Sequence, residues 1–245
     1  MSLKDDVRQS LPEHRSVEDG PMNRRRFIKT SLTAAAAAAG STLFNAVLPA
    51  QSRADNTDRK HAMNILVITG SPRKNGNSAI LASQFIRGAE EAGHTVARFD
   101  AALSSVHPCL ACNSCGMNGP CVIEDDFDFV REHIIPADLV AFATPMYYFG
   151  ISAQLKAVID RFYAINGSLH TPKQAVLLMT YANNSRRNES PILTHYDVLL
   201  EYMGWTDAGR VIAPGVWTAG SIERTPFPEQ AYRLGLGLRK IGAPS

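Results

Sequence analysis

Residues 63–80 read MNILVITGSPRKNGNSAI, and this stretch decides the fold class. Its continuous apolar run, residues 65–69, predicts a strand that is buried on both faces, as strands of parallel sheets are. A loop of Gly, Ser and Asn residues follows. Residues 78–92 then place apolar side chains at helical spacing until Gly93 stops the helix. A strand that passes through a short loop into a helix is the opening of a strand–helix–strand unit.

The rest of the chain repeats this alternation. Further strands are expected at residues 95–100, 139–143, 174–181 and 209–213, and further helices at residues 126–134, 152–163, 192–203 and 229–240. Alternating strands and helices predict an α/β fold in which helices cover both faces of a parallel sheet. Because no internal repeat or interior linker is visible, residues 63–245 are expected to form one domain.

Composition excludes some classes of protein. The chain has 25 Lys and Arg residues against 23 Asp and Glu residues, a formal net charge of +2. No basic stripe interleaved with aromatic residues is found, so a nucleic-acid partner is not expected. The values of 45% hydrophobic and 20% charged residues are ordinary for a globular protein.

The residues before the first strand have the order of a secretory signal. Residues 22–29 are polar and basic, residues 30–48 are apolar and uncharged, and residues 49–54 are more polar. The sequence from Asn23 to Lys29, NRRRFIK, resembles the twin-arginine signal pattern. It predicts export to the periplasm of an already folded protein, with cleavage near Ala54.

Two other readings of this leader are a membrane anchor and a disordered Ala-rich segment. The apolar part is just long enough to span a bilayer, but it is rich in Ala and only weakly hydrophobic, so no lasting anchor is expected. Residues 1–21 are interpreted as a disordered extension, residues 22–54 as the signal and residues 55–62 as a linker.

The loop after the first strand has the composition of an anion site. It lies where the crevice of an open parallel sheet forms, and unpaired N–H groups at the start of a helix favour an anion. Gly70 and Gly76 allow a close backbone approach, and the polar side chains are Ser71, Arg73, Asn77 and Ser78. The pattern is neither a Walker loop nor GxGxxG. The alternative is an ordinary turn in which Asn77 or Ser78 caps the helix.

A second loop, residues 144–150, follows the third strand. It offers a rigid Pro, three consecutive aromatic residues and a Gly, which suit a flat heterocycle. Alone, the aromatic residues would be expected merely to cover the end of the sheet. In one crevice with an anion site, the two loops together predict a phosphorylated aromatic cofactor.

At this point the residues carry a family resemblance. GSPRKNGNS (70–78), PMYYFGISAQLKAVIDRF (145–162) and the cysteine segment between them resemble the NAD(P)H-dependent FMN reductase branch of the flavodoxin-like superfamily, and within it the iron–sulfur flavoproteins. The resemblance covers most of residues 63–182. It implies a three-layer, doubly wound, five-stranded sheet of order 2-1-3-4-5, bound FMN, and NAD(P)H as a donor.

The resemblance also implies which residues hold FMN. It assigns the phosphate to Ser71, Arg73, Asn77 and Ser78. It assigns the ribityl chain and the ring to Pro145, Met146, Tyr147, Tyr148, Phe149 and Gly150. The loop that begins at Tyr181 would touch the edge of the ring, although residues 181–184 match the family poorly.

All the cysteines lie in one window: Cys109, Cys112, Cys115 and Cys121. Their spacing resembles the motif that holds a [4Fe–4S] cluster in iron–sulfur flavoproteins, and closely spaced thiolates on a loop can converge on one cluster. Three alternatives are open. They are a zinc site, which more usually has two separated cysteine pairs, two disulfides after export, and free thiols.

These observations predict an FMN-dependent oxidoreductase that moves electrons from a reduced donor to a small acceptor, a flavin or a quinone. No side chain is assigned as acid or base, because FMN carries the chemistry. The rival is a non-enzymatic electron carrier that serves a redox protein. A homodimer or homotetramer is what the resemblance suggests.

Several other residues receive plain structural interpretations. Lys156, Asp160 and Arg161 are expected on one helix, where the first two form a surface pair. The acidic run 124–126 is expected to cap the next helix. Trp205, Trp217 and the stretch 224–232 could shape a substrate entrance or a subunit contact.

Overall fold

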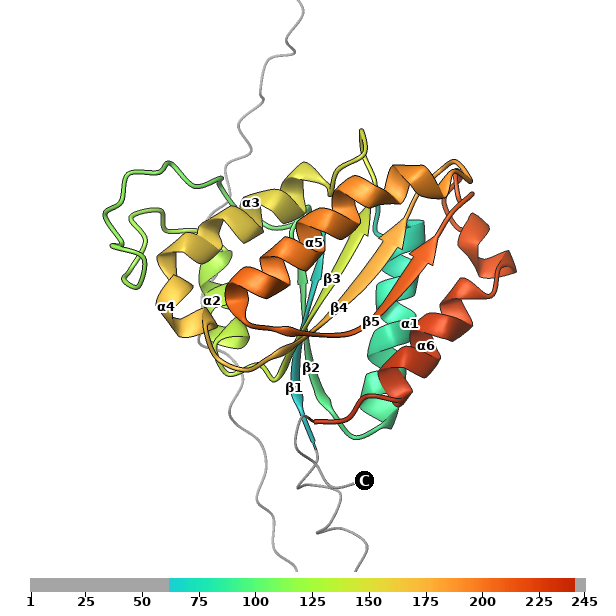
Figure 1. Ribbon diagram of the computed structural model, residues 1–245, viewed down its shortest axis with the longest axis horizontal. Helices are drawn as coiled ribbons and strands as arrows, with labels where there is room; N and C mark the ends of the chain where they lie inside the picture. The colour runs from blue at the N-terminus through green and yellow to red at the C-terminus, as the bar shows by residue number, and fades with distance from the viewer. Residues whose placement is uncertain (1–61, 241–245) are drawn as a thin grey trace, which may run out of the picture. The chain divides into compact units, whose positions relative to one another are not determined.

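The structure, a computed structural model, describes residues 62–240. Five parallel strands form one sheet in the order β2-β1-β3-β4-β5 (Figure 1). They are β1 (Asn64–Thr69), β2 (Thr95–Asp100), β3 (Leu139–Pro145), β4 (Gln174–Thr180) and β5 (Thr206–Ala213). The predicted α/β class and the flavodoxin-like strand order are therefore confirmed. The predicted extension, signal and most of the linker lie outside the described residues.

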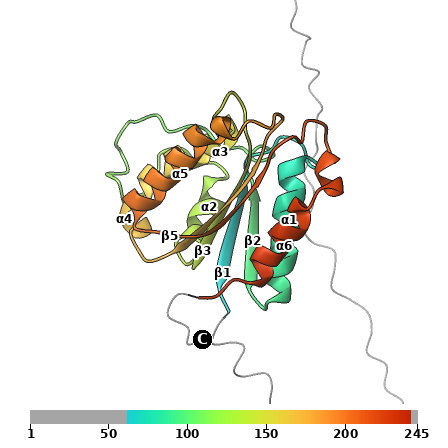
Figure 2. The same cartoon turned by 45° about the vertical axis from the view of Figure 1, so that its right-hand side comes forward.

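Helices cover both faces of this sheet. The α-helices are α1 (Asn77–Glu91), α2 (Phe127–Ile134), α3 (Ala153–Arg161), α4 (Asn166–Leu169), α5 (Ser190–Met203) and α6 (Phe227–Leu236). Three 3-10 turns are η3 (Phe162–Ala164), η4 (Arg186–Glu189) and η5 (Ser221–Arg224). Figure 2 shows α1 and α6 against one face and α2, α3 and α5 against the other. The three-layer prediction is thus confirmed.

Each face of the sheet has its own apolar core. Alternate strand residues such as Leu66 and Ile68 pack with α2, α3 and α5, whereas Ile65 and Val67 pack with α1 and α6. In β1, every residue after Asn64 is buried. A strand enclosed on both faces needs apolar side chains at successive positions, which is why its sequence is a continuous run.

The α1–α6 layer depends on two glycines. A Cβ atom on Gly88 would lie 2.0 Å from the carbonyl oxygen of Tyr232, and one on Gly235 would lie 2.2 Å from that of Phe85. The two helix backbones therefore approach more closely than any side chain would permit. This contact holds α6 against the helix that begins at the predicted anion loop.

Some predicted boundaries were wrong for identifiable reasons. β5 begins at Thr206 and not at residue 209, because Gly209 lies inside the strand, next to an irregularity in its pairing with β4. The short helix α4 was not predicted. The last helix begins at Phe227 and ends at Leu236, so its predicted bounds were displaced toward the C-terminus.

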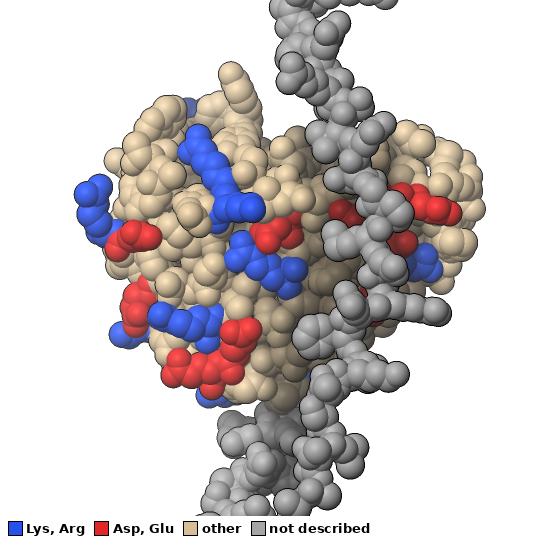
Figure 3. All heavy atoms as spheres, turned by 180° about the vertical axis from the view of Figure 1, so that it is seen from behind, with Lys and Arg blue, Asp and Glu red and all other residues tan. Residues whose placement is uncertain are grey.

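The surface carries mixed charge. Figure 3 shows acidic and basic side chains interspersed over the face that it displays, as the near-balanced composition leads one to expect. Among residues 62–240, no helix has the length and apolar character that crossing a membrane requires.

Candidate functional site

The loop between β1 and α1 packs against the start of α3. The Gly70 N–H donates to the Ala143 carbonyl at 2.8 Å, which ties the loop to β3. A Cβ atom on Gly70 would lie 2.1 Å from Ser152 Oγ. The glycine is therefore needed for the close approach of the start of α3.

Ser71 shapes the next part of this loop. Its Oγ accepts from the Arg73 N–H at 3.2 Å, and the Arg73 carbonyl accepts from the Gly76 N–H at 3.0 Å. A Cβ atom on Gly76 would lie 2.9 Å from Ser71 Oγ and 3.0 Å from Arg73 Cβ. At Gly76 the close approach is between parts of the loop itself, and it closes a small backbone cradle.

The start of α1 opens onto this cradle. Gly76 is the N-cap, so the alternative that Asn77 or Ser78 caps the helix was wrong. No hydrogen bond joins the backbone N–H groups of Asn77, Ser78 or Ala79 to another described residue. Three unpaired donors at the positive end of a 15-residue helix are suited to an anion.

The Asn77 side chain has a different partner from the one expected. Its Nδ2 donates to the carbonyls of Val216 (3.1 Å) and Thr218 (2.9 Å), and its Oδ1 accepts from the Ile222 N–H at 3.3 Å. The amide thus fixes the loop after β5 against the start of α1. For a bound anion, Asn77 offers its backbone N–H.

The aromatic loop after β3 forms a two-residue hairpin. Tyr147 and Gly150 exchange two backbone hydrogen bonds of 3.0 Å. The two central residues, Tyr148 and Phe149, have φ angles of 45° and 64°. This turn normally requires Gly or Asn at such positions, so two aromatic residues there are strained. Tyr148 is fully exposed.

Tyr181 lies at the end of β4 on the wall of the same cleft. Its hydroxyl donates to Glu189 Oε1 at 2.6 Å, and both residues are buried. Burial, together with the hydrogen bond and the charge of Glu189, raises the pKa of Tyr181 to about 12. Its hydroxyl therefore stays protonated at neutral pH and turns toward Glu189.

These elements enclose a cleft of about 670 Å³ at the carboxyl end of the sheet. Its wall contains every residue predicted to hold FMN except Phe149 and Gly150, which form the outer part of the hairpin. Among the described residues that line the cleft, only Arg73 is charged. With a cation at one end and aromatic side chains at the other, the cleft suits an anionic molecule that carries a flat ring.

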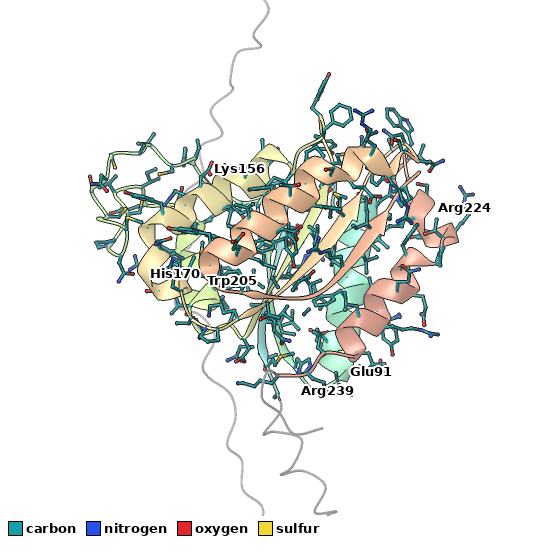
Figure 4. All side chains as sticks on the ribbon, in the orientation of Figure 1. Glu91, Lys156, His170, Trp205, Arg224 and Arg239 are labelled. Carbon is teal, nitrogen blue, oxygen red and sulfur yellow. The ribbon has the colours of Figure 1, made fainter. Side chains whose placement is uncertain are left out.

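Part of the wall was missed in the sequence. Val216, Thr218 and Ala219, in the loop after β5, line the cleft together with Trp217. The sequence could have indicated these residues, because this loop also follows the carboxyl end of a strand, where ligands of open parallel sheets bind. Trp205, also considered for a substrate entrance, is buried, and Figure 4 places it away from the upper strand ends that carry the cleft.

The four cysteines line one small hollow in the loop between β2 and α2. All four are free thiols, with Cys112 exposed and the others half-buried. The Ala111 N–H donates to Cys109 Sγ at 3.4 Å, and hydrogen bonds from Ser114 lower the pKa of Cys112. Within residues 62–240, no three His, Cys, Asp or Glu side chains are grouped as a single metal ion would need.

The backbone of this loop is unusual. Ala111, Asn113, Gly116 and Met117 all have φ between 53° and 67°. Left-handed residues interspersed in a short loop turn N–H groups toward the inside and form concavities that suit anions, including iron–sulfur centres.

The charged residues at the end of α3 differ in exposure. Lys156 and Asp160 form the expected surface pair, whereas Arg161 on the same helix is only 1% exposed. Its Nη1 forms a buried ion pair with Asp125 Oδ2 at 2.9 Å. The acidic run caps α2 as expected. Asp126 is the N-cap residue, and the side chain that accepts from the first helical N–H, that of Phe127, is Asp125.

Comparison with known proteins agrees with this architecture. The sequence model of the family described as "NADPH-dependent FMN reductase" matches residues 63–211. The chain is 35% identical over 99 residues to an iron-sulfur flavoprotein of Methanocaldococcus jannaschii, which is 40% of this chain and 51% of that protein. It is 28% identical to an iron-sulfur flavoprotein of Archaeoglobus fulgidus, over 63% of this chain and 70% of the other.

A solved structure has the same fold. The Trp repressor binding protein from Bacillus subtilis superimposes with a TM-score of 0.53 at 26% identity. The match covers 69% of this chain and 99% of that one. The chain thus spans nearly all of this structure, but only about half the length of the first relative.

Proposed function

Because the chain belongs to the NADPH-dependent FMN reductase family, we propose that it is an FMN-dependent oxidoreductase. One observation carries this proposal: unpaired N–H groups at the start of α1 and the aromatic hairpin after β3 lie on the same cleft. The phosphate of FMN would occupy the first part and its ring the second. When bound, FMN supplies the acceptance and release of electrons.

The residues of the chain position this cofactor. The N–H groups of Asn77 and Ser78 and the Arg73 guanidinium would hold the phosphate, and Ser71 keeps the loop in shape. Tyr147, Tyr148 and Trp217 offer ring surfaces. No side chain is assigned as general acid or base, because FMN would carry the chemistry.

The donor and acceptor can be tested with the purified protein. An anaerobic sample is mixed first with NADPH or NADH and then with a quinone or free flavin. Rapid bleaching of the flavin followed by turnover supports the enzyme. A flavin that dithionite reduces but neither nicotinamide bleaches would overturn the nicotinamide donor.

A second function has its own observation, the hollow lined by four cysteines. Zinc with four thiolate ligands at 2.3 Å would bring the sulfurs within about 3.8 Å of one another, and the thiols are not grouped in this way. A [4Fe–4S] cluster spreads its ligands over four irons, and a loop with interspersed left-handed residues, as this one has, suits its negative charge. We propose that Cys109, Cys112, Cys115 and Cys121 hold such a cluster.

With a cluster, the protein could also pass single electrons between FMN and a redox protein. The two functions are distinguished by the nicotinamide experiment. A protein that a redox partner reduces, and that neither nicotinamide bleaches, would be a carrier.

Export by the twin-arginine route is proposed from the sequence of residues 22–54 alone. The test replaces Arg24 and Arg25 by Lys and measures the protein in periplasmic and cytoplasmic fractions. The variant is expected to remain in the cytoplasm with FMN bound. Equal export of the variant would contradict this route.

A further inference from the structure

The cysteine loop depends on one segment far away in the sequence. The Tyr163 hydroxyl donates to Asn113 Oδ1 at 2.8 Å, and Ser168 Oγ donates to Asn118 Oδ1 at 3.0 Å. Asn118 also forms an isolated antiparallel bridge with Ile165. The cysteine loop, which is the green loop beside α4 in Figure 1, thus packs against the residues that immediately follow α3.

Arg161, at the end of α3, joins the two ends of this loop. Its Nη1 donates to the His107 carbonyl at 3.1 Å, on the side that precedes Cys109. Its Nη2 donates to the Ile123 carbonyl at 3.2 Å, on the side that follows Cys121. Both stems of the loop are therefore held by one planar guanidinium.

Asp125 neutralises this guanidinium. Its Oδ2 accepts from Arg161 Nη1 at 2.9 Å and from the His107 N–H at 2.9 Å, and its side chain is 2% exposed. The ring of Phe127 lies under the guanidinium at 4.7 Å. The positive charge of Arg161 is already paired with Asp125. What a lysine could not replace here is therefore the planar set of N–H donors of the guanidinium, and not its charge.

One donor of this arginine has no acceptor. Nε is buried and makes no hydrogen bond to another described residue, although Nη1 and Nη2 do. A buried donor without a partner is costly, so a missing acceptor is indicated. Arg161 is itself part of the wall of the cysteine hollow. A thiolate or sulfide in that hollow would be the acceptor.

We propose that Arg161 is the positioning residue of the cysteine site: its Nη atoms close the loop, and its Nε–H donates to a sulfur of the bound cluster. This inference rests on the proposed [4Fe–4S] centre. A hydrogen bond to sulfur stabilises the more negative, reduced form, so it raises the reduction potential of the cluster.

The test compares Arg161→Lys with Arg210→Lys. Arg210 is a matched control, because it also pairs with carboxylates (Asp197 and Asp207) and lies over an aromatic ring (Tyr196), but on α5 and β5. Each protein is purified anaerobically, and FMN, iron and sulfide per chain are measured. The midpoint potential of the cluster is then determined by redox titration.

The wild type and Arg210→Lys are expected to contain about four irons and four sulfides per chain. Arg161→Lys should bind FMN normally but lose at least half of its iron, and the remaining cluster should have a lower potential. An equal loss in Arg210→Lys would overturn the assignment, as would full iron with an unchanged potential in Arg161→Lys. A wild type without iron would instead overturn the proposed centre.

A second measurement avoids variants that could fail to fold. Wild-type protein is made with arginine labelled with ¹⁵N in the guanidino group, the cluster is reduced, and pulsed electron paramagnetic resonance is recorded. A ¹⁵N coupling that unlabelled protein lacks is expected from Arg161. Absence of this coupling in a fully loaded sample would overturn the hydrogen bond from Nε.

Discussion

The two loops that carry the proposed chemistry are built in different ways. The turn at residues 71–76 is shaped by contacts within six residues, those among Ser71, Arg73 and Gly76, and its two ends are tied to β3 and to the loop after β5. The cysteine loop contains no strand or helix between residues 101 and 126, and it is held by Arg161, 36 residues beyond Asp125. Contacts between near neighbours shape the turn of the proposed phosphate site, whereas a side chain distant in sequence, Arg161, holds the cysteine loop.

The helix α3 lies between these two loops. Its N-cap, Ser152, lies beside Gly70 of the first loop, and its last residue, Arg161, closes the second. Nine residues correspond to about 13 Å of helix. The two loops can therefore be perturbed separately.

The largest effect is expected for Arg161→Met. This variant leaves the buried carboxylate of Asp125 without its partner. Removal of one partner from a buried ion pair lowers the free energy of unfolding by about 3–5 kcal/mol. Urea unfolding of the cofactor-free protein measures the free energy of unfolding. Lys156→Met is the control, because its pair with Asp160 is exposed and such pairs contribute about 0–1 kcal/mol. Similar losses in both variants would contradict the role of Arg161.

Gly76→Ala perturbs the first loop. The added Cβ would meet Ser71 Oγ and Arg73, and overpacking of this kind costs about 1–3 kcal/mol, so FMN should bind about tenfold or more weakly. Fluorescence titration measures the affinity, and the iron content should not change. Gly93→Ala, with φ of 87° and no atom near the new Cβ, should lower stability without weakening FMN binding. Unchanged affinity in Gly76→Ala would count against the cradle.

The hairpin provides a stabilising variant. Tyr148 and Phe149 have left-handed φ angles, so Tyr148→Asn combined with Phe149→Gly should increase stability by about 1–2 kcal/mol. Thermal unfolding without cofactor checks this. FMN should bind less tightly because a ring surface is removed from the cleft. A less stable double variant would show that the turn is not strained.

The smallest effect concerns pH. Burial opposes ionisation of Asp125, but hydrogen bonds from the His107 N–H and from Arg161 outweigh it and lower its pKa from the ordinary value of 3.8. Stability from this group is therefore present above pH 3.8 and is lost as the pH falls through the lower folded pKa. Urea unfolding between pH 2 and pH 6 should show a weaker acid dependence in Asp125→Asn. An unaltered profile would assign the acid sensitivity to other carboxylates.

This contrast also explains what the sequence could reveal. The sheet order and the first loop follow from apolar runs and loop composition, because the interactions that shape them are local or belong to the strand pattern. The clamp by Arg161 was not predicted, since sequence spacing cannot show that a helix end meets a loop 36 residues earlier. The strain at Tyr148 was equally invisible, because nothing in the residue types indicates a left-handed backbone.

The cleft loop after β5 is an intermediate case. Its position at a strand end was predictable, but its contact with Asn77 depends on the packing of α1 and α6. Consequently Asn77 was assigned to the ligand, although its amide binds Val216, Thr218 and Ile222.

The central claim is that the cleft between residues 70–78 and the aromatic hairpin is an FMN site held by its phosphate. Titration of cofactor-free protein with FMN and with riboflavin, which lacks the phosphate, tests it most directly. One charge-assisted hydrogen bond contributes about 1.5–3 kcal/mol, so one FMN per chain should bind, with riboflavin at least about tenfold weaker. Equal affinity for both, or no binding of either, would contradict the account.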